Sequence, residues 1–267
     1  MREGIFITLE GPDGAGKTTQ MEKIREFFEA QGRTVLLTRE PGGTAISEKL
    51  REILLDRSNS EMSGITEMLI YAAARAQHVA ERIKPALERG EIVICDRFVD
   101  SSVAYQGYGR GLGDAVREVN RYALDGLEPD VTFFLDLDPA VGRARIGKDV
   151  QDRMEQENLT FHYKVYEGYC DICREEPNRV VRIDATGTID EMQQEIRRHL
   201  RRICETSEAG INEDAGSGNG DGADKCIGDE IDECMSKELS ESADDGLSGN
   251  GFSEATDDGK DSKACRH

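Results

Sequence analysis

The chain has 267 residues and a formal net charge of −20, a length that suits one or two domains. After residue 204 lie 18 of the 54 acidic residues but only 5 of the 34 basic ones. The preceding part is therefore only mildly acidic and has no broad basic face, which excludes a general nucleic-acid binder. It also lacks a membrane-spanning apolar run and a signal-peptide pattern, so we expect a cytoplasmic protein without a nucleic-acid or membrane partner.

Short apolar runs alternate with helical patterns along residues 1–204. The predicted strands are 5–9, 34–38, 92–95, 131–135 and 179–183, and the predicted helices are 17–31, 47–55, 61–89, 114–127, 139–146, 155–175 and 189–203. Strands that alternate with helices form a parallel sheet covered on both faces. We therefore predict an α/β fold for residues 1–204, with a five-stranded parallel sheet whose ligands bind beyond the carboxyl ends of the strands.

A glycine-rich segment directly follows the first predicted strand and precedes the first predicted helix. It reads GPDGAGKT, which is the G-x-x-x-x-G-K-[ST] pattern of a phosphate-binding P-loop. We expect Lys17 to reach the β- and γ-phosphates of a nucleotide and the Thr18 hydroxyl to hold Mg²⁺. The predicted ATP-binding residues are Gly11, Pro12, Asp13, Gly14, Ala15, Gly16, Lys17, Thr18 and Thr19.

Two charged residues, Asp96 and Arg97, follow the third predicted strand. An aspartate at a strand end near a P-loop is placed to organise Mg²⁺, often through water. The neighbouring arginine can grip a phosphate with two parallel hydrogen bonds. The segment 39–41 ends the second predicted strand, so we expect three strand ends to meet at one site.

The cysteines and histidines predict no metal site. Seven scattered cysteines do not form a disulfide framework. Cys170 and Cys173 form a lone C-x-x-C without a second ligand pair at zinc spacing, so packing is the better interpretation than metal or redox chemistry. The four histidines are not grouped as metal ligands.

The composition changes at residue 205. From there the chain is rich in Gly, Ser, Asp and Glu and has a single aromatic residue, Phe252. Such a segment buries too little apolar surface to offset its ordering entropy. We expect residues 205–267 to be a disordered, solubilising tail, and its sequence indicates no particular partner.

Five further motifs carry a resemblance to a known family. They are TREPGGT at 38–44, YAAARAQH at 71–78, the DRF-to-YQG run at 96–107, FLDLDP at 134–139 and DRMEQE at 152–157. With the P-loop, they make residues 3–203 resemble thymidylate kinase, a P-loop nucleoside monophosphate kinase. The resemblance implies transfer of the γ-phosphoryl group of ATP to dTMP, giving dTDP and ADP for dTTP biosynthesis. It also implies a homodimer, the usual state of the family.

The resemblance assigns an acceptor site. Asp13 matches the residue that contacts the 3′-hydroxyl, and Arg51 and Arg97 match arginines that hold the dTMP phosphate. Tyr71 stands where the family usually has a phenylalanine stacked on thymine. The others are Arg75 near the base carbonyl, Ser102 and Gln106 at the base, and Tyr105, which crowds the 2′ position.

Gly14 stands where some family members carry an arginine in the P-loop. Members without that arginine supply basic catalytic residues from a lid, which here matches residues 147–153. Positive groups at that position stabilise the charge of the transferring phosphoryl group. The candidates are Arg145, Lys148 and Arg153. The spacing of the motif does not show which of them is catalytic.

Two alternatives stay open. A kinase for another small monophosphate, such as dUMP, would share nearly every motif. A nucleotide switch that binds ATP and acts on a partner through the tail belongs to another class. The expected acceptor residues, such as Arg51 and Tyr71, argue against the switch.

Overall fold

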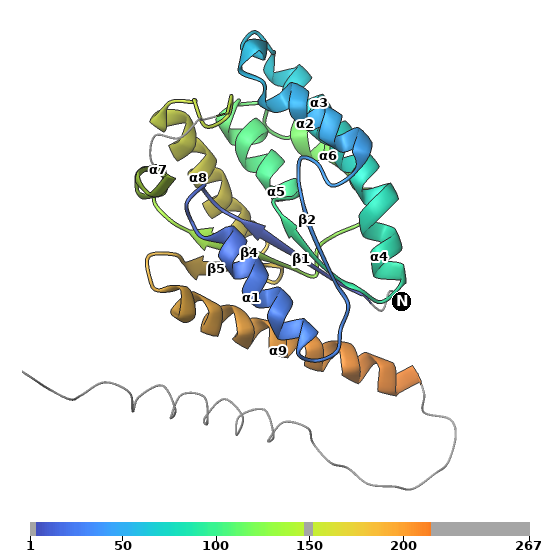
Figure 1. Ribbon diagram of the computed structural model, residues 1–267. Helices are drawn as coiled ribbons and strands as arrows, with labels where there is room; N and C mark the ends of the chain where they lie inside the picture. Colours follow the sequence, from blue (N-terminus) through green and yellow to red (C-terminus); the bar gives the residue numbers. More distant parts are fainter. Residues whose placement is uncertain (1–3, 147–151, 215–267) are drawn as a thin grey trace, which may run out of the picture. The chain divides into compact units, whose positions relative to one another are not determined.

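The computed structural model describes residues 4–146 and 152–214 (Figure 1). Contacts between Cα atoms divide the chain into two units, Met1–Ile211 and Asn212–His267, and the account below concerns the first. None of its described helices is long and apolar enough to cross a membrane.

A single five-stranded parallel sheet forms the centre of this unit (Figure 1). Its strands are β1 (Ile5–Glu10), β2 (Val35–Arg39), β3 (Ile92–Asp96), β4 (Val131–Asp136) and β5 (Val180–Asp184). They lie in the order β2-β3-β1-β4-β5, and every neighbouring pair is parallel. The predicted sheet is confirmed, and each strand lies within a residue of its expected position.

Helices cover both faces of the sheet. They are α1 (Lys17–Glu29), α2 (Ala45–Leu55), α3 (Gly64–His78), α4 (Lys84–Glu88), α5 (Val99–Ser102), α6 (Ala115–Leu124), α7 (Pro139–Ile146), α8 (Leu159–Glu175) and α9 (Ile189–Asp214). A short 3₁₀ turn spans Arg57–Asn59, and π-helical turns η2 (Val79–Ile83) and η3 (Val103–Gly109) extend α3 and α5.

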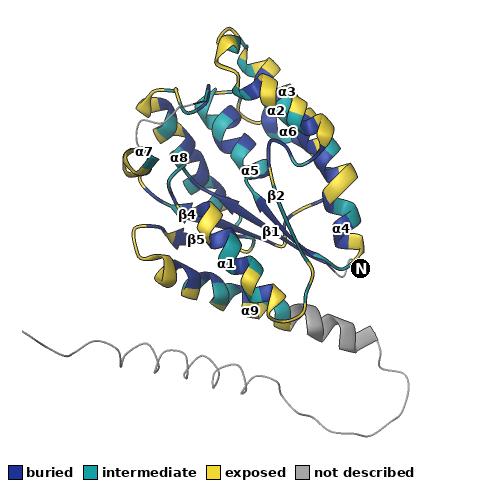
Figure 2. Cartoon of the chain, in the orientation of Figure 1, coloured by how far each residue is buried: buried dark blue, intermediate teal, exposed yellow. Residues whose placement is uncertain are grey.

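The alternation of side chains along β1 explains the two layers. Ile5, Ile7 and Leu9 pack into a core with α1 and α9, whereas Phe6 packs on the opposite face with η2 and α4. Both faces of a central parallel strand are therefore buried, as its continuous apolar sequence requires. Figure 2 shows the central strands β1, β3 and β4 buried and the outer helix faces exposed.

The segment 99–109 is helical, which the sequence analysis did not predict. Its glycines and serines are poor helix formers, so the local sequence gives a weak signal. In the structure, the residues of η3 pack closely against α8. Tertiary packing therefore decides the conformation here.

Four predicted helix ends were wrong by three residues or more. The helix expected to end at residue 127 ends at Leu124. The helix expected from residue 61 starts at Gly64, where the Ser63 hydroxyl accepts a hydrogen bond from the Thr66 N–H. The helix expected from residue 155 starts at Leu159, with Asn158 as its N-cap. These side chains satisfy amides that the first turn leaves free. At the other end of the unit, α9 continues past residue 204 to Asp214, and the rest of the expected tail lies outside the described residues.

Candidate active site

The P-loop connects β1 to α1 and takes a conformation that suits glycine. Gly11, Gly14 and Gly16 have φ angles of 131°, 80° and 94°. A Cβ atom on Gly14 would lie 2.5 Å from the Gly142 carbonyl oxygen of α7. Gly16 caps α1 without a side chain, so the first amides of the helix are available to an anion.

The Lys17 side chain lies folded over this loop. Its Nζ donates to the carbonyl oxygens of Gly11 and Pro12, both at 3.1 Å, and to Asp13 Oδ1 at 3.4 Å. Burial, together with the nearby Arg97 charge, lowers the pKa of Lys17. Thr18 and Thr19 are exposed at the start of α1. The residues expected to bind the phosphates therefore lie together in one continuous segment, the P-loop and the start of α1.

Asp96, at the end of β3, has an orphaned carboxylate oxygen. Its Oδ1 is buried and has no hydrogen-bond partner among the described residues. A carboxylate oxygen of this kind fits a hard cation such as Mg²⁺. The described residues contain no cluster of three or more His, Cys, Asp or Glu side chains suited to a metal. This agrees with the way Mg²⁺ is usually bound, through one or two protein groups plus substrate phosphates.

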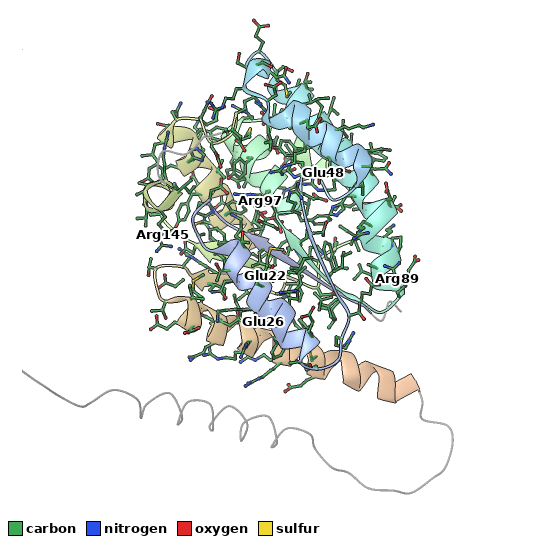
Figure 3. All side chains as sticks on the ribbon, viewed as in Figure 1. Glu22, Glu26, Glu48, Arg89, Arg97 and Arg145 are labelled. Atoms are coloured by element: carbon green, nitrogen blue, oxygen red, sulfur yellow. The ribbon has the colours of Figure 1, made fainter. Side chains whose placement is uncertain are left out.

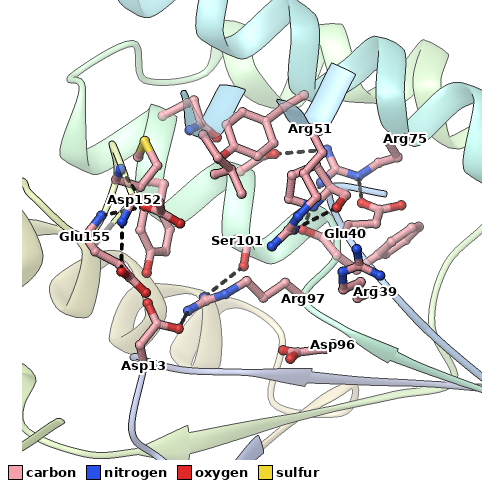
Figure 4. Close-up of a pocket in the computed structure, with 18 residues that line it drawn as sticks. Asp13, Arg39, Glu40, Arg51, Arg75, Asp96, Arg97, Ser101, Asp152 and Glu155 are labelled. Carbon is pink, nitrogen blue, oxygen red and sulfur yellow. Dashed lines mark hydrogen bonds and ion pairs between the residues drawn. The ribbon is translucent and has the colours of Figure 1, made fainter. Parts of the chain in front are cut away.

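A cavity of about 180 Å³ opens beside the P-loop (Figure 4). The acceptor residues expected from the resemblance all line it, together with Asp96. They are Asp13, Arg51, Tyr71, Arg75, Arg97, Ser102, Tyr105 and Gln106. The structure thus brings together side chains from the P-loop, α2, α3, β3, α5 and η3.

Arg97 lies between the P-loop and the cavity. Its backbone has a φ of 64°, a left-handed conformation that is unusual for a residue with a side chain. Its Nη2 donates to Asp13 Oδ1 at 2.7 Å, and its Nη1 donates to the Tyr169 hydroxyl at 3.2 Å. Burial alone would raise the pKa of Asp13, but Arg97 and Lys17 hold it well below its usual range. Asp13 is therefore ionised between two cations.

Glu10, the last residue of β1, was not predicted as a site residue. It is fully buried, and its Oε1 accepts hydrogen bonds from the Phe98 N–H at 2.7 Å and the Ser101 N–H at 3.2 Å. Its Oε2 contacts the hydroxyls of Ser101 at 2.5 Å and Tyr169 at 2.8 Å. Burial and the nearby Asp100 raise its pKa to about 7. The sequence did contain a signal for Glu10, because a carboxylate at the end of an apolar strand is unusual.

Most N–H groups of the Arg75 side chain, on α3, already donate hydrogen bonds within the protein. Its guanidinium donates to Glu40 Oε2 and Ser102 Oγ, at 2.8 and 2.9 Å, to Asn120 Oδ1, and to the Phe98 carbonyl oxygen at 2.9 Å. A guanidinium has five N–H groups, so among the described residues one Nη2 N–H is left for a ligand. The predicted base-reading role thus depends on this single donor.

The two tyrosines of the cavity are neutral. Burial raises the pKa of Tyr71 and of Tyr105, and the Arg97 charge only partly offsets this effect at Tyr105. The Arg97 guanidinium lies over the Tyr105 ring, 5.2 Å from its centroid. Arg51 reaches the cavity from α2 and donates to the Pro41 carbonyl oxygen at 2.8 Å.

Arg145 and Arg153, the two described candidates for the lid, have different partners. Arg145 lies beside the P-loop, and its Nη1 is 3.3 Å from the Gly14 carbonyl oxygen (Figure 3). Arg153 is buried, and its guanidinium donates to Glu67 Oε2 at 2.7 Å and to the Leu54 carbonyl oxygen at 2.8 Å. Lys148 and most of the expected lid lie outside the described residues.

The cavity has further polar lining that the sequence analysis did not assign. Asp152 and Glu155 line it on the same side as Asp13 (Figure 4). Burial, with Asp152 and Asp13 nearby, raises the pKa of Glu155. Ser101 lines it as well, and so does the segment 39–41, which was expected here as the end of the second predicted strand. These residues could have been predicted from the sequence, because they lie in the motifs that carry the resemblance.

The C-x-x-C pair does not enter this site. Cys170 and Cys173 are free thiols, half-buried on α8, and both pack against the core that contains Phe134. Burial, with Cys170 nearby, raises the pKa of Cys173 to about 11. A thiol with a raised pKa is a poor nucleophile and metal ligand.

Comparison with known proteins agrees with this geometry. The family model described as thymidylate kinase matches residues 9–196. A thymidylate kinase from Lactobacillus delbrueckii subsp. bulgaricus is 54% identical over 195 residues, which are 71% of this chain and 92% of that protein. One from Geobacillus sp. is 50% identical over 194 residues, again 71% of this chain and 92% of that protein.

A solved structure agrees as well. The crystal structure of thymidylate kinase from Ehrlichia chaffeensis superimposes with a TM-score of 0.62 at 34% sequence identity, covering 74% of this chain and 98% of that one. The chain therefore belongs to the thymidylate kinase family, nucleoside monophosphate kinases that phosphorylate dTMP to dTDP with ATP in dTTP synthesis.

Proposed function

We propose that the P-loop of this chain holds the ATP phosphates and that the adjoining cavity holds dTMP, so that the two substrates meet at Asp13. One observation carries the proposal: Asp13 accepts hydrogen bonds from both Lys17 and Arg97. The residue expected to bind the donor phosphates and the residue expected to bind the acceptor phosphate thus share one carboxylate. Phosphoryl transfer needs this kind of close, aligned placement of donor and acceptor.

The chemistry requires no strong general base. The attacking oxygen belongs to a phosphate whose second pKa is about 6, so it is largely ionised at neutral pH. Lys17 and the loop amides hold the donor phosphates, while Arg51 and Arg97 aim the acceptor. Mg²⁺, held by Thr18 and Asp96, would neutralise charge on the ATP phosphates when bound.

The nucleoside part of dTMP is assigned to the far side of the cavity. Tyr71 offers an aromatic face for the base, and Tyr105 restricts the space beside the sugar. Arg75, Ser102 and Gln106 provide polar groups for the base edge. Arg145 and Lys148 are the proposed sources of positive charge for the transition state. Arg153, the third candidate, is buried and pairs with Glu67 and the Leu54 carbonyl oxygen, so it is not assigned this role.

The same proposal includes a homodimer that acts in the cytoplasm. Large apolar side chains are exposed on two packed helices: Ile46 and Ile53 on α2, and Ile65 and Leu69 on α3. Large apolar side chains exposed on neighbouring helices are a common feature of protein interfaces. Light scattering should give a mass near twice the 29.6 kDa of one chain.

Lys17→Ala tests the donor site. Removing the ammonium should lower dTMP-dependent ADP formation by about 10²-fold or more, with the fold preserved. Lys23→Ala is the matched control, because Lys23 lies on the same helix and pairs only with the exposed Asp190. Wild-type turnover by Lys17→Ala would refute the assignment.

A further inference from the structure

Glu67 is a fully buried carboxylate one helical turn away from the cavity. It lies on α3, four residues before Tyr71, which in turn lies four residues before Arg75, so the three side chains share one face of the helix. Tyr71 and Arg75 line the cavity, and Glu67 does not. It therefore touches no substrate and can act only through its neighbours.

Four hydrogen-bond donors surround this carboxylate. Gln106 Nε2 donates to Oε1 at 2.9 Å, and Arg110 donates to Oε1 at 3.2 Å and to Oε2 at 3.0 Å. Arg153 Nη1 is 2.7 Å from Oε2. Burial alone would raise the pKa of Glu67, but the hydrogen bonds from Arg110 and Gln106 lower it. Glu67 is therefore ionised and can only accept hydrogen bonds.

This fixes the orientation of the Gln106 amide. An amide side chain can turn over and exchange its donor and acceptor ends, but an ionised carboxylate pairs only with the donor end. Gln106 is almost fully buried and lines the cavity. Its NH₂ group donates to Glu67, so its carbonyl oxygen is the acceptor that it can offer to a ligand.

Arg75 supplies the complementary group. Glu40, also buried, accepts a hydrogen bond from Arg75 Nε. This bond holds the guanidinium in place, and its remaining N–H group can donate to a ligand. The cavity thus presents an acceptor at Gln106 and a donor at Arg75. A thymine or uracil ring has the matching N–H donor and exocyclic oxygen, whereas cytosine carries an acceptor nitrogen and an exocyclic amino donor.

We propose that Glu67 is a positioning residue for base specificity: it holds Gln106 in the orientation that accepts thymine or uracil and rejects cytosine. The inference rests on the proposed function and adds to it the residue that sets the hydrogen-bonding polarity of the pocket. A site that leaves polar groups unpaired with the wrong ligand discriminates by large factors.

The test measures kcat/KM for dTMP, dUMP and dCMP in each variant. Glu67→Gln replaces the obligatory acceptor with an amide, so Gln106 becomes free to turn. The dTMP-to-dCMP ratio should fall by about tenfold or more, while the dTMP-to-dUMP ratio stays constant because those two bases present the same edge. Damage to the fold alone would lower all three values together.

Glu157→Gln is the matched control. It removes the other carboxylate paired with Arg110, at 2.5 Å, and leaves the contact between Glu67 and Gln106 intact. Its ratios should equal those of the wild type.

Gln106→Met provides a second route if Glu67→Gln does not fold, because both arginines still pair with Glu67. It should lower the dTMP-to-dCMP ratio to the same extent. If Glu67→Gln does fold, the double variant should show the same ratio as Gln106→Met alone. An unchanged ratio in folded Glu67→Gln or in Gln106→Met overturns the inference. Absence of dTMP turnover in the wild type would instead overturn the proposed function.

Discussion

Arg97 and Asp13 join the ends of two neighbouring strands across the candidate active site. Arg97 Nη2 lies 2.7 Å from Asp13 Oδ1, although 84 residues separate them in the chain. Arg97 follows β3 and Asp13 belongs to the loop after β1, and these two strands are paired in the sheet. The parallel pairing therefore creates the ion pair, because it brings the carboxyl ends of both strands to one edge.

Replacing Arg97 should weaken use of the acceptor. We expect Arg97→Ala to lower kcat/KM for dTMP by about 10- to 100-fold, since hydrogen bonds to charged groups contribute about 1.5–3 kcal/mol. Arg97→Lys keeps the charge but loses the planar fork, so its value should lie between those of Arg97→Ala and the wild type. Steady-state kinetics with varied dTMP provide the measurement. Wild-type kcat and KM in Arg97→Ala would show that Arg97 does not hold the acceptor.

Glu10 should make stability depend on pH. Its pKa is about 7 in the folded chain, against an ordinary value of 4.5, so the folded state binds the proton more tightly than the unfolded state does. The resulting stabilisation is complete below about pH 4.5 and is lost as the pH rises through 7. Its size is on the order of 3 kcal/mol.

The measurement is thermal or urea unfolding of wild type and Glu10→Gln from pH 4.5 to 8. Glutamine keeps the shape of the protonated acid but does not titrate there, so the stability of the variant relative to wild type should rise with pH. A difference independent of pH would contradict the raised pKa of Glu10.

Tyr169 should contribute to activity through its hydroxyl. That group accepts from Arg97 Nη1 at 3.2 Å and donates to Glu10 Oε2 at 2.8 Å. Tyr169→Phe removes the hydroxyl and keeps the ring that stacks on Phe134. We expect kcat/KM for dTMP to fall about fivefold, which corresponds to about 1 kcal/mol for one hydrogen bond.

Tyr166→Phe is the control on the same helix, since the Tyr166 hydroxyl donates to Asp136 rather than to a group of the cavity. It should retain wild-type kinetics. Equal losses in the two variants would point to a general effect on α8 instead of support for Arg97.

The sequence was sufficient to predict the sheet and much of the site lining. Apolar strands and the P-loop pattern are local signals, so β1 and Lys17 could be placed from short stretches of residues. Tyr71, Arg75 and Gln106 were predicted from the resemblance, and all three line the cavity. The helical spacing of Tyr71 alone would equally have suited a core residue, and Gln106 alone would have suited a residue that packs a loop.

The partners of these residues could not be predicted, because they depend on tertiary packing. Tyr169 lies 159 residues from Glu10, and no local pattern connects them. Glu67 has the sequence position of an ordinary first-turn acid of a helix. Only the packing of η3, of the residue after it and of the last residue of the expected lid brings Gln106, Arg110 and Arg153 to Glu67.

The acidic tail should be dispensable for catalysis. Chains ending after residue 204 or after residue 214 both retain Met192, Ile196 and Leu200, the α9 side chains that pack against the sheet. We expect dTMP-dependent turnover and Tm to stay close to those of the full chain. A large loss of either on removing residues 215–267 would show that the tail belongs to the folded enzyme.

ADP formation from Mg-ATP by the purified full-length chain, with dTMP, dUMP, dGMP, dCMP and AMP supplied separately, tests the central claim most directly. The account predicts turnover that strongly favours dTMP. Turnover that favours another monophosphate would retain the kinase and contradict the assigned base pocket. Binding of ATP without acceptor-dependent turnover would contradict the enzymatic assignment itself.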